Sequence, residues 1–169
     1  MKHTLRVSAA AACLAALGAA AQDASLPSGY TCCNLHYSGD WISDGNWGSF
    51  PMIPAGTPIK VLSYGSNRAH VEIDGKNFRI GHDYGRNQES LEQYIAKLVV
   101  RENPRPKIEA YPGGIREAIR LGKLTQGMTR EQAIIAAGYP ATHRTPVLDA
   151  PEWTYWTERL KSYRVTWDK

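Results

Sequence analysis

The segment LTQGMTREQAIIAAGYP, residues Leu124 to Pro140, carries the signals for the start and the end of one short helix. Thr129 and Gln132 have the spacing of an N-terminal capping box, and Gly138 supplies the stop. About eight helical residues remain between them, fewer than the ~12–15 that are stable alone in water. The apolar residues 133–137 ring nearly the whole circumference. The helix is therefore expected to form only when it is wedged between other elements.

Two runs further along the chain predict a partner for this helix. Residues 152–157 (EWTYWT) and 162–167 (SYRVTW) are rich in aromatic and β-branched residues, which is typical of a β-hairpin. Trp153 and Tyr155 share one face of the first strand. The second strand has a face that could pair with them, made of Tyr163, Val165 and Trp167.

Helical patterns also precede the opening segment. Apolar residues in 91–99 form one helical stripe, with Ser90 and Gln93 as a capping box. A further helix is expected after Pro112, because residues 115–122 repeat at helical spacing. Between the two, ENPRPK (102–107) predicts a boundary, since prolines stop both helix and sheet.

Residues 30–84 read as β-structure. In RAHVEI (68–73) apolar and polar residues alternate, the pattern of a half-buried strand. Asp74-Gly75 then predicts a hairpin turn. With IKVLS (59–63) and two short runs upstream, about five strands around a long Gly- and Pro-rich loop would suit a small barrel.

The N-terminus predicts export. Residues 1–21 carry Lys2 and Arg6, then an apolar run and a small-residue cleavage site, as in a signal peptide. Residues 22–29 are expected to be a linker. Lipid anchoring at Cys13 is the less favoured alternative, because the apolar run continues past it. Without Lys2 and Arg6 the chain keeps 18 basic and 16 acidic residues, a net charge of +2, which gives no nucleic-acid signal. The mature chain has no other segment that could span a membrane.

Cys32 and Cys33 are adjacent. In an oxidising compartment they could form a vicinal disulfide or a bridge to another chain, or they could be two small buried hydrophobic residues. The spacing differs from the C-x-x-C of catalytic thiol pairs, so redox catalysis is not favoured.

The ordered set Gly127-Met128-Thr129, Gln132-Ala133, Gly138-Tyr139-Pro140 and Trp153-Thr154-Tyr155 resembles the SmpA/OmlA (BamE-like) domain. That domain belongs to the small lipoprotein of the outer-membrane β-barrel assembly complex. The resemblance implies a helix pair packed on a short antiparallel sheet over 108–169, acting as a docking module for envelope proteins. The family's sheet usually has a third strand, whereas this sequence stops at Lys169 after the second. An open edge would be a pairing site.

The segment IPAGTPIKVLSYGSNRAHVEIDGKNFRIG resembles a bacterial SH3-like domain. This resemblance implies an SH3-like β-barrel over 30–84 that binds cell wall or other proteins, or a barrel with no ligand. Residues 85–103 would then connect the two modules, giving an α+β protein.

Surface chemistry favours binding over catalysis. Trp156 falls out of register with Trp153 and Tyr155, so it points to the other sheet face and either contacts a partner or covers the β module. With Arg144 and Trp153 it forms the predicted binding set, because interfaces are enriched in Trp, Tyr and Arg. No catalytic residue, metal or cofactor is predicted. Asp44 and Asn46 are interpreted as local turn formers rather than calcium ligands.

The sequence therefore predicts a non-catalytic binding or scaffold protein of the bacterial envelope, in the periplasm or at the outer-membrane periphery. Its expected partners are envelope proteins, among them the β-barrel assembly complex. Two alternatives remain open: a secreted inhibitor or cell-wall-binding protein, and an envelope hydrolase or redox protein that uses Cys32 or Cys33 with His70 or His82.

Overall fold

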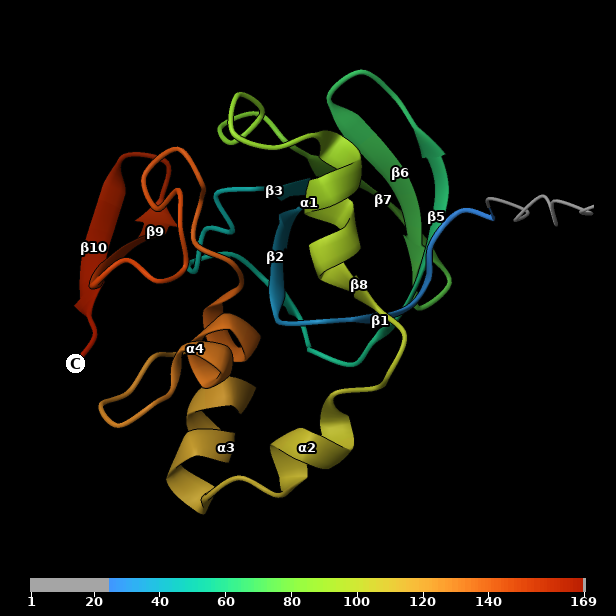
Figure 1. The fold of residues 1–169 in the computed structure, drawn as a ribbon. Coiled ribbons are helices and arrows are strands. Elements are labelled where there is room, and N and C mark those ends of the chain that lie inside the picture. The colour runs from blue at the N-terminus through green and yellow to red at the C-terminus, as the bar shows by residue number, and fades with distance from the viewer. Residues whose placement is uncertain (1–24, 169) are drawn as a thin grey trace, which may run out of the picture.

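The computed structural model describes residues 25–168, which form a mixed α+β fold with a large curled sheet, a separate two-stranded sheet and four helices (Figure 1). The predicted signal peptide 1–21, Cys13 and the first residues of the predicted linker lie outside these residues. The end of the predicted linker is not a linker, because Ser28 and Gly29 belong to the first strand.

The curled sheet has eight strands in the order β4-β2-β3-β7-β6-β5-β1-β8. All neighbours are antiparallel except β3 and β7, which are parallel. The strands are β1 (Ser28–Thr31), β2 (Leu35–Ser38), β3 (Trp41–Ser43), β4 (Met52–Ile53), β5 (Pro58–Tyr64), β6 (Arg68–Ile73), β7 (Lys76–Gly81) and β8 (Val99–Val100).

The predicted alternation and hairpin are confirmed. Ala69, Val71 and Ile73 of β6 are buried, whereas the residues between them are exposed. The Asp74-Gly75 turn pairs Ile73 with Lys76. Strand β3 lies at WIS, one of the two short upstream runs where the sequence suggested a strand, and the Gly- and Pro-rich loop around it also contains β4. β3 joins the sheet beside β7, about forty residues later, and no local signal indicates such distant pairing.

Helix α1 (Leu91–Leu98) begins at the predicted capping box of Ser90 and Gln93. Its apolar stripe packs into the same core as the curled sheet, and Ile95 and Leu98 are fully buried there. Figure 1 shows this helix lying across the concave side of the sheet. Residues 91–98 are thus part of the sheet's core and not only a connection.

Helix α2 (Arg105–Glu109) lies where the sequence predicted a boundary. The prolines of this run thus do not exclude a helix, and the module boundary stays a prediction. Proline is tolerated in the first turn of a helix, where its missing N–H has no helical partner, and Pro106 lies in that turn.

Helix α4 (Arg130–Ala137) is wedged between two partners, as its composition predicted. On one side Ile135 and Ala136 pack against Ile119 of α3 (Gly113–Arg120). On the other side Ala133 and Ala137 pack against the hairpin of β9 (Glu152–Glu158) and β10 (Lys161–Thr166).

The hairpin presents its aromatic face to α4. Trp153 pairs with Val165, and Tyr155 pairs with Tyr163. Trp153 is fully buried, and its ring contacts Trp167 with centroids 4.7 Å apart. The predicted matching of the two strand faces is confirmed.

Two buried asparagines join the curled sheet to the helix pair. The side-chain amide of Asn34 donates to the carbonyl oxygens of Ile119 and Ala136, at 2.7 and 2.9 Å. The amide of Asn46 donates to Ala137 O at 2.8 Å. The bonds to Ala136 and Ala137 satisfy carbonyls at the end of α4 that have no partner within that helix, whereas Ile119 O at the end of α3 also accepts from Gly122 N at 3.0 Å. Asn46 also closes a turn, as the sequence indicated, because its N–H donates to Ser43 O at 3.0 Å; its side-chain bonds extend beyond that turn.

Gly138 allows this close approach. It ends α4 with φ +80°, a conformation that side chains rarely adopt. A Cβ atom here would also collide with the Asn46 side-chain nitrogen.

Candidate functional site: an aromatic pocket between sheet and hairpin

One face of the β9–β10 hairpin packs on α4, and its other face turns toward the loop that follows β3. Gly48 N donates to Trp156 O, and Ser49 N donates to Thr157 O, each at 3.1 Å. The loop therefore lies along the outer edge of β9. Trp156 is half-buried against it, so this residue covers the N-terminal part of its own chain.

Aromatic rings from four separate segments meet at this contact. Tyr84 stacks on His143 with centroids 5.4 Å apart, and His143 stacks on Trp156 at 6.1 Å. Trp47 meets the edge of Tyr84 at 6.5 Å. A small cavity of about 30 Å³ opens between them, here called the seam pocket; it is lined by Gly45, Trp47, Tyr84, His143, Trp156 and Arg159.

The pocket combines aromatic walls with polar atoms. The indole nitrogen of Trp156 and Nδ1 of His143 are buried and have no hydrogen-bond partner among the described residues. Burial, and then the nearby Arg144, lower the pKa of His143, which favours a neutral imidazole at pH 7. Arg144 and Arg159 are exposed. The surface around the pocket therefore presents aromatic rings, unpaired polar atoms and two arginines, whereas the pocket itself, at about 30 Å³, has room only for a water-sized group.

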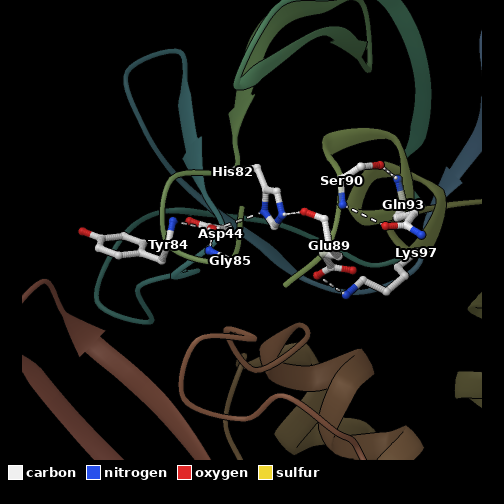
Figure 2. Close-up of polar contacts among 8 residues, drawn as sticks. All are labelled: Asp44, His82, Tyr84, Gly85, Glu89, Ser90, Gln93 and Lys97. Atoms are coloured by element: carbon white, nitrogen blue, oxygen red, sulfur yellow. Dashed lines mark hydrogen bonds and ion pairs between the residues drawn. The ribbon is translucent and has the colours of Figure 1, made fainter. Parts of the chain in front are cut away.

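Asp44 holds the loop that carries Tyr84. Its Oδ2 accepts hydrogen bonds from Tyr84 N and Gly85 N, both at 2.9 Å (Figure 2). A Cβ atom on Gly85 would collide with Thr142 Oγ1, so glycine allows this loop to pack against residue 142. Asp44 lies in the turn after β3, as the sequence indicated, and its carboxylate also acts across forty residues.

His82 lies between Asp44 and the far end of the same loop (Figure 2). Its Nδ1 is 3.3 Å from Asp44 Oδ2, and its Nε2 is 3.0 Å from Glu89 O. A carbonyl oxygen only accepts, so Nε2 must carry a proton. The ring stacks on Tyr94 at 4.7 Å, and burial raises the pKa of that tyrosine. His82 is only 2% exposed, which makes it an anchor for the loop.

Lys97 extends this support to α4. It forms a 2.6 Å ion pair with Glu89, beside the Ser90–Gln93 capping box (Figure 2). Its ammonium also lies 5.0 Å from the ring of Tyr139, just after α4. The loop 82–90 is thus fixed at both ends, and Tyr84 is held at the pocket's wall.

The three residues that the sequence predicted for binding do not form one site in the structure. Trp156 lines the seam pocket, and Arg144 is exposed next to His143. Trp153 is fully buried under α4, so its proposal as a surface contact was wrong. Sequence reasoning missed Trp47, Tyr84, His143 and Arg159. A usable signal was the placement of Trp47 and Tyr84 in polar loops, where no core packing explains a large ring.

The remaining reactive side chains do not gather at the pocket. Cys32 and Cys33 are both buried and form a vicinal disulfide. His36 is buried, which lowers its pKa, whereas His70 is exposed on β6. Within residues 25–168, no cluster of His, Cys, Asp and Glu could hold a metal ion.

Compared with protein-family models, curated proteins and solved structures, the chain has no significant match. Among the helices of the described part, none is long and apolar enough to cross a membrane.

Proposed function

We propose that this chain is a non-catalytic binding protein of the bacterial cell envelope, and that the seam pocket is its docking site. The observation that carries the proposal is the stack of Tyr84, His143 and Trp156 beside Arg159. Interfaces between proteins are enriched in tyrosine, tryptophan and arginine. Such residues dominate binding energy where they line a pocket.

The partner that suits this surface is a protein segment with an apolar or aromatic side chain, which packs over the rim of the pocket, followed by a carboxylate. The ring edges would pack against Trp47 and Tyr84, and the carboxylate would reach Arg159 or Arg144. Because loop 82–90 is held by buried contacts, little ordering entropy is lost when a partner binds.

The burial of the reactive groups supports binding rather than catalysis. A general base must come within hydrogen-bond reach of its substrate, whereas His82 and Asp44 are 2% and 4% exposed. The two cysteines are bonded to each other. An envelope hydrolase that uses Cys32 or Cys33 is therefore the weaker alternative.

The two family resemblances of the sequence lead to a more specific assignment of the parts of the fold and of the partner. In this proposal the curled sheet with β5–β7 is an SH3-like part, and α3, α4 and the hairpin form a SmpA/OmlA-like part. The packing of α4 on Trp153 and Tyr155 supports that arrangement. The partner would then belong to the outer-membrane β-barrel assembly complex.

Site-specific photo-crosslinking in intact cells tests the proposal. A benzophenone amino acid at Arg159 should give one defined adduct with an envelope protein. The same group at Lys76, in the β6–β7 turn, is the control and should give none. Tyr84→Ala should reduce the Arg159 adduct about tenfold, which corresponds to about 1.4 kcal/mol of binding free energy.

Each result decides a different part of the proposal. Equal adducts from positions 159 and 76, or none from 159, would overturn the docking role. An adduct with a component of the β-barrel assembly complex would support the finer assignment. An adduct with a secreted enzyme, or with cell-wall material alone, would replace it with the inhibitor or wall-binding alternative.

A further inference from the structure

The two edges of the β9–β10 hairpin differ. In an antiparallel pair, alternate residues direct their backbone groups toward the partner strand and away from it. Trp167 N donates to Pro151 O, which continues the register of Thr166 with Glu152. The backbone N–H and C=O groups of Tyr163 and Val165 therefore point toward β9. The backbone groups that point outward from β10 belong to Ser162, Arg164 and Thr166.

The outer edge of β9 is closed by the protein itself. Thr154 N donates to the hydroxyl of Thr145 at 3.1 Å. The carbonyl oxygens of Trp156 and Thr157 accept from Gly48 and Ser49. Strand β9 cannot accept a further strand without displacing these contacts.

The outer edge of β10 is open. Among residues 25–168, no hydrogen bond reaches the outward backbone groups of Ser162, Arg164 and Thr166. In Figure 1 this strand lies at the margin of the molecule. A free edge must be satisfied by water or by another strand, and such edges promote pairing.

A groove runs beside this edge. It has a volume of about 770 Å³ and lies between β10 and the loop that precedes α4. Leu124, Met128 and Val165 contribute half-buried apolar side chains. The charged residues that line the groove are Arg130, Arg164 and Asp168, so its net charge is positive. Alternate side chains of a strand placed beside β10 would point into this groove.

Charge decides between two occupants of the edge. The strand β10, KSYRVT, carries Lys161 and Arg164 and no acidic residue. Edge pairing between two copies would bring four cations together, and like charges across a strand pair are destabilising. Arg164 has only an exposed 3.4 Å contact with Glu152. A strand with an acidic residue opposite Arg164 fits better.

We infer that β10 binds an extended peptide segment of a partner protein, which becomes the third strand of this sheet. The segment has apolar residues at alternate positions and an acidic residue opposite Arg164. Six residues of β10 span about 20 Å, so roughly five to seven peptide residues are engaged. This inference does not depend on the seam pocket, because the two sites share no residue.

Selection of peptides tests it directly. Random twelve-residue peptides displayed on phage are selected on the full chain. Thr166→Pro removes an outward N–H, and proline is tolerated on an edge strand at such a position. Thr166→Ala is the matched control, since it keeps the N–H. Selected peptides should alternate apolar residues with acidic ones, and they should bind Thr166→Pro at least about tenfold more weakly than Thr166→Ala.

A second variant keeps the test decisive if Thr166→Pro fails to fold. Arg164→Glu leaves the backbone intact and should shift the selected peptides from acidic to basic. Hydrogen exchange of the free chain should be fast at Ser162, Arg164 and Thr166 and slow at Tyr163 and Val165. Bound peptide should slow the first three.

Several results would overturn the inference. Peptides that bind Thr166→Pro and Thr166→Ala equally would show that the edge is not used. Slow exchange at Ser162, Arg164 and Thr166 in a monomeric free chain would show that the chain's own N-terminal residues cover it. A dimer in sedimentation that Thr166→Pro dissociates would identify a second copy as the occupant. The crosslinking result at Arg159 bears only on the proposal for the seam pocket, and it leaves the conclusion about β10 to the peptide experiment.

Discussion

The side-chain nitrogen of Asn34 lies 2.9 Å from the carbonyl oxygen of Ala136, 102 residues further along the chain. The same amide group also binds Ile119 O and, through its oxygen, Ala55 N. One buried side chain thus joins the curled sheet, α3 and α4. The two parts that the sequence suggests are therefore expected to unfold together.

Removing this junction should destabilise the whole chain. Asn34→Ala leaves one carbonyl, that of Ala136, and one N–H, that of Ala55, without partners in the interior, whereas Ile119 O keeps its bond from Gly122 N; each unpaired group costs about 1–3 kcal/mol. We expect the free energy of unfolding in urea to fall by at least about 2 kcal/mol, in one transition. Asn77→Ala, at an exposed site of β7, is the control and should change it little. Two separate transitions in the wild type would contradict a single folding unit.

Asp44 should control the order of the loop that carries Tyr84. Asp44→Ala removes the acceptor of Tyr84 N and Gly85 N and leaves His82 without its carboxylate. We expect faster hydrogen exchange at both amides and a weaker Arg159 crosslink. Asp74→Asn is the control, because asparagine tolerates the positive φ of that turn. Unchanged exchange in Asp44→Ala would show that the loop is held by other contacts.

Tyr155 should make the protein sensitive to alkali. Burial raises the pKa of Tyr155 far above its ordinary value, so the folded state keeps the phenol proton. The unfolded chain releases it near pH 10. Stability from this group is complete below that pH and is lost above it, by about 1.4 kcal/mol per pH unit.

Tyr155→Phe separates this effect from the hydrogen bond to Gly138 O, 3.1 Å long. At pH 7 the variant should be less stable by about 1 kcal/mol, because that bond is lost. Above about pH 10 its stability should decline less steeply than that of the wild type. Urea unfolding at a series of pH values measures both, and parallel curves would contradict the prediction.

The vicinal disulfide predicts a simple chemical result. After unfolding without reductant, Cys32 and Cys33 should resist alkylation by iodoacetamide, and both should react once reductant is added. Mass spectrometry of the peptide that contains them gives the answer. Alkylation of both without reductant would show two buried free thiols instead.

Local sequence signals predicted the elements that depend on neighbouring residues. The capping boxes at Ser90 and Thr129 start α1 and α4, the Asp74-Gly75 turn joins β6 to β7, and the aromatic runs form the C-terminal hairpin. Each of these signals acts within a few residues, so it can be recognised in a short segment of the sequence.

Contacts between distant residues could not be read in this way. The parallel pairing of β3 with β7, the long-range bonds of Asn34 and Asp44, and the burial of Trp153 all depend on how the elements pack. The sequence offered Trp156 and Arg144 as binding residues, but only packing brought Tyr84 and His143 beside Trp156.

By itself, then, the sequence determined the short helix at 130–137, its aromatic partner and the alternating strands, because capping, turn chemistry and periodicity act over a few residues. The tertiary structure alone decided that one hairpin edge is closed and the other open, and that four separate segments enclose a pocket. Both features arise where backbone groups and rings far apart in the chain satisfy one another, or are left unsatisfied, and no local pattern records that.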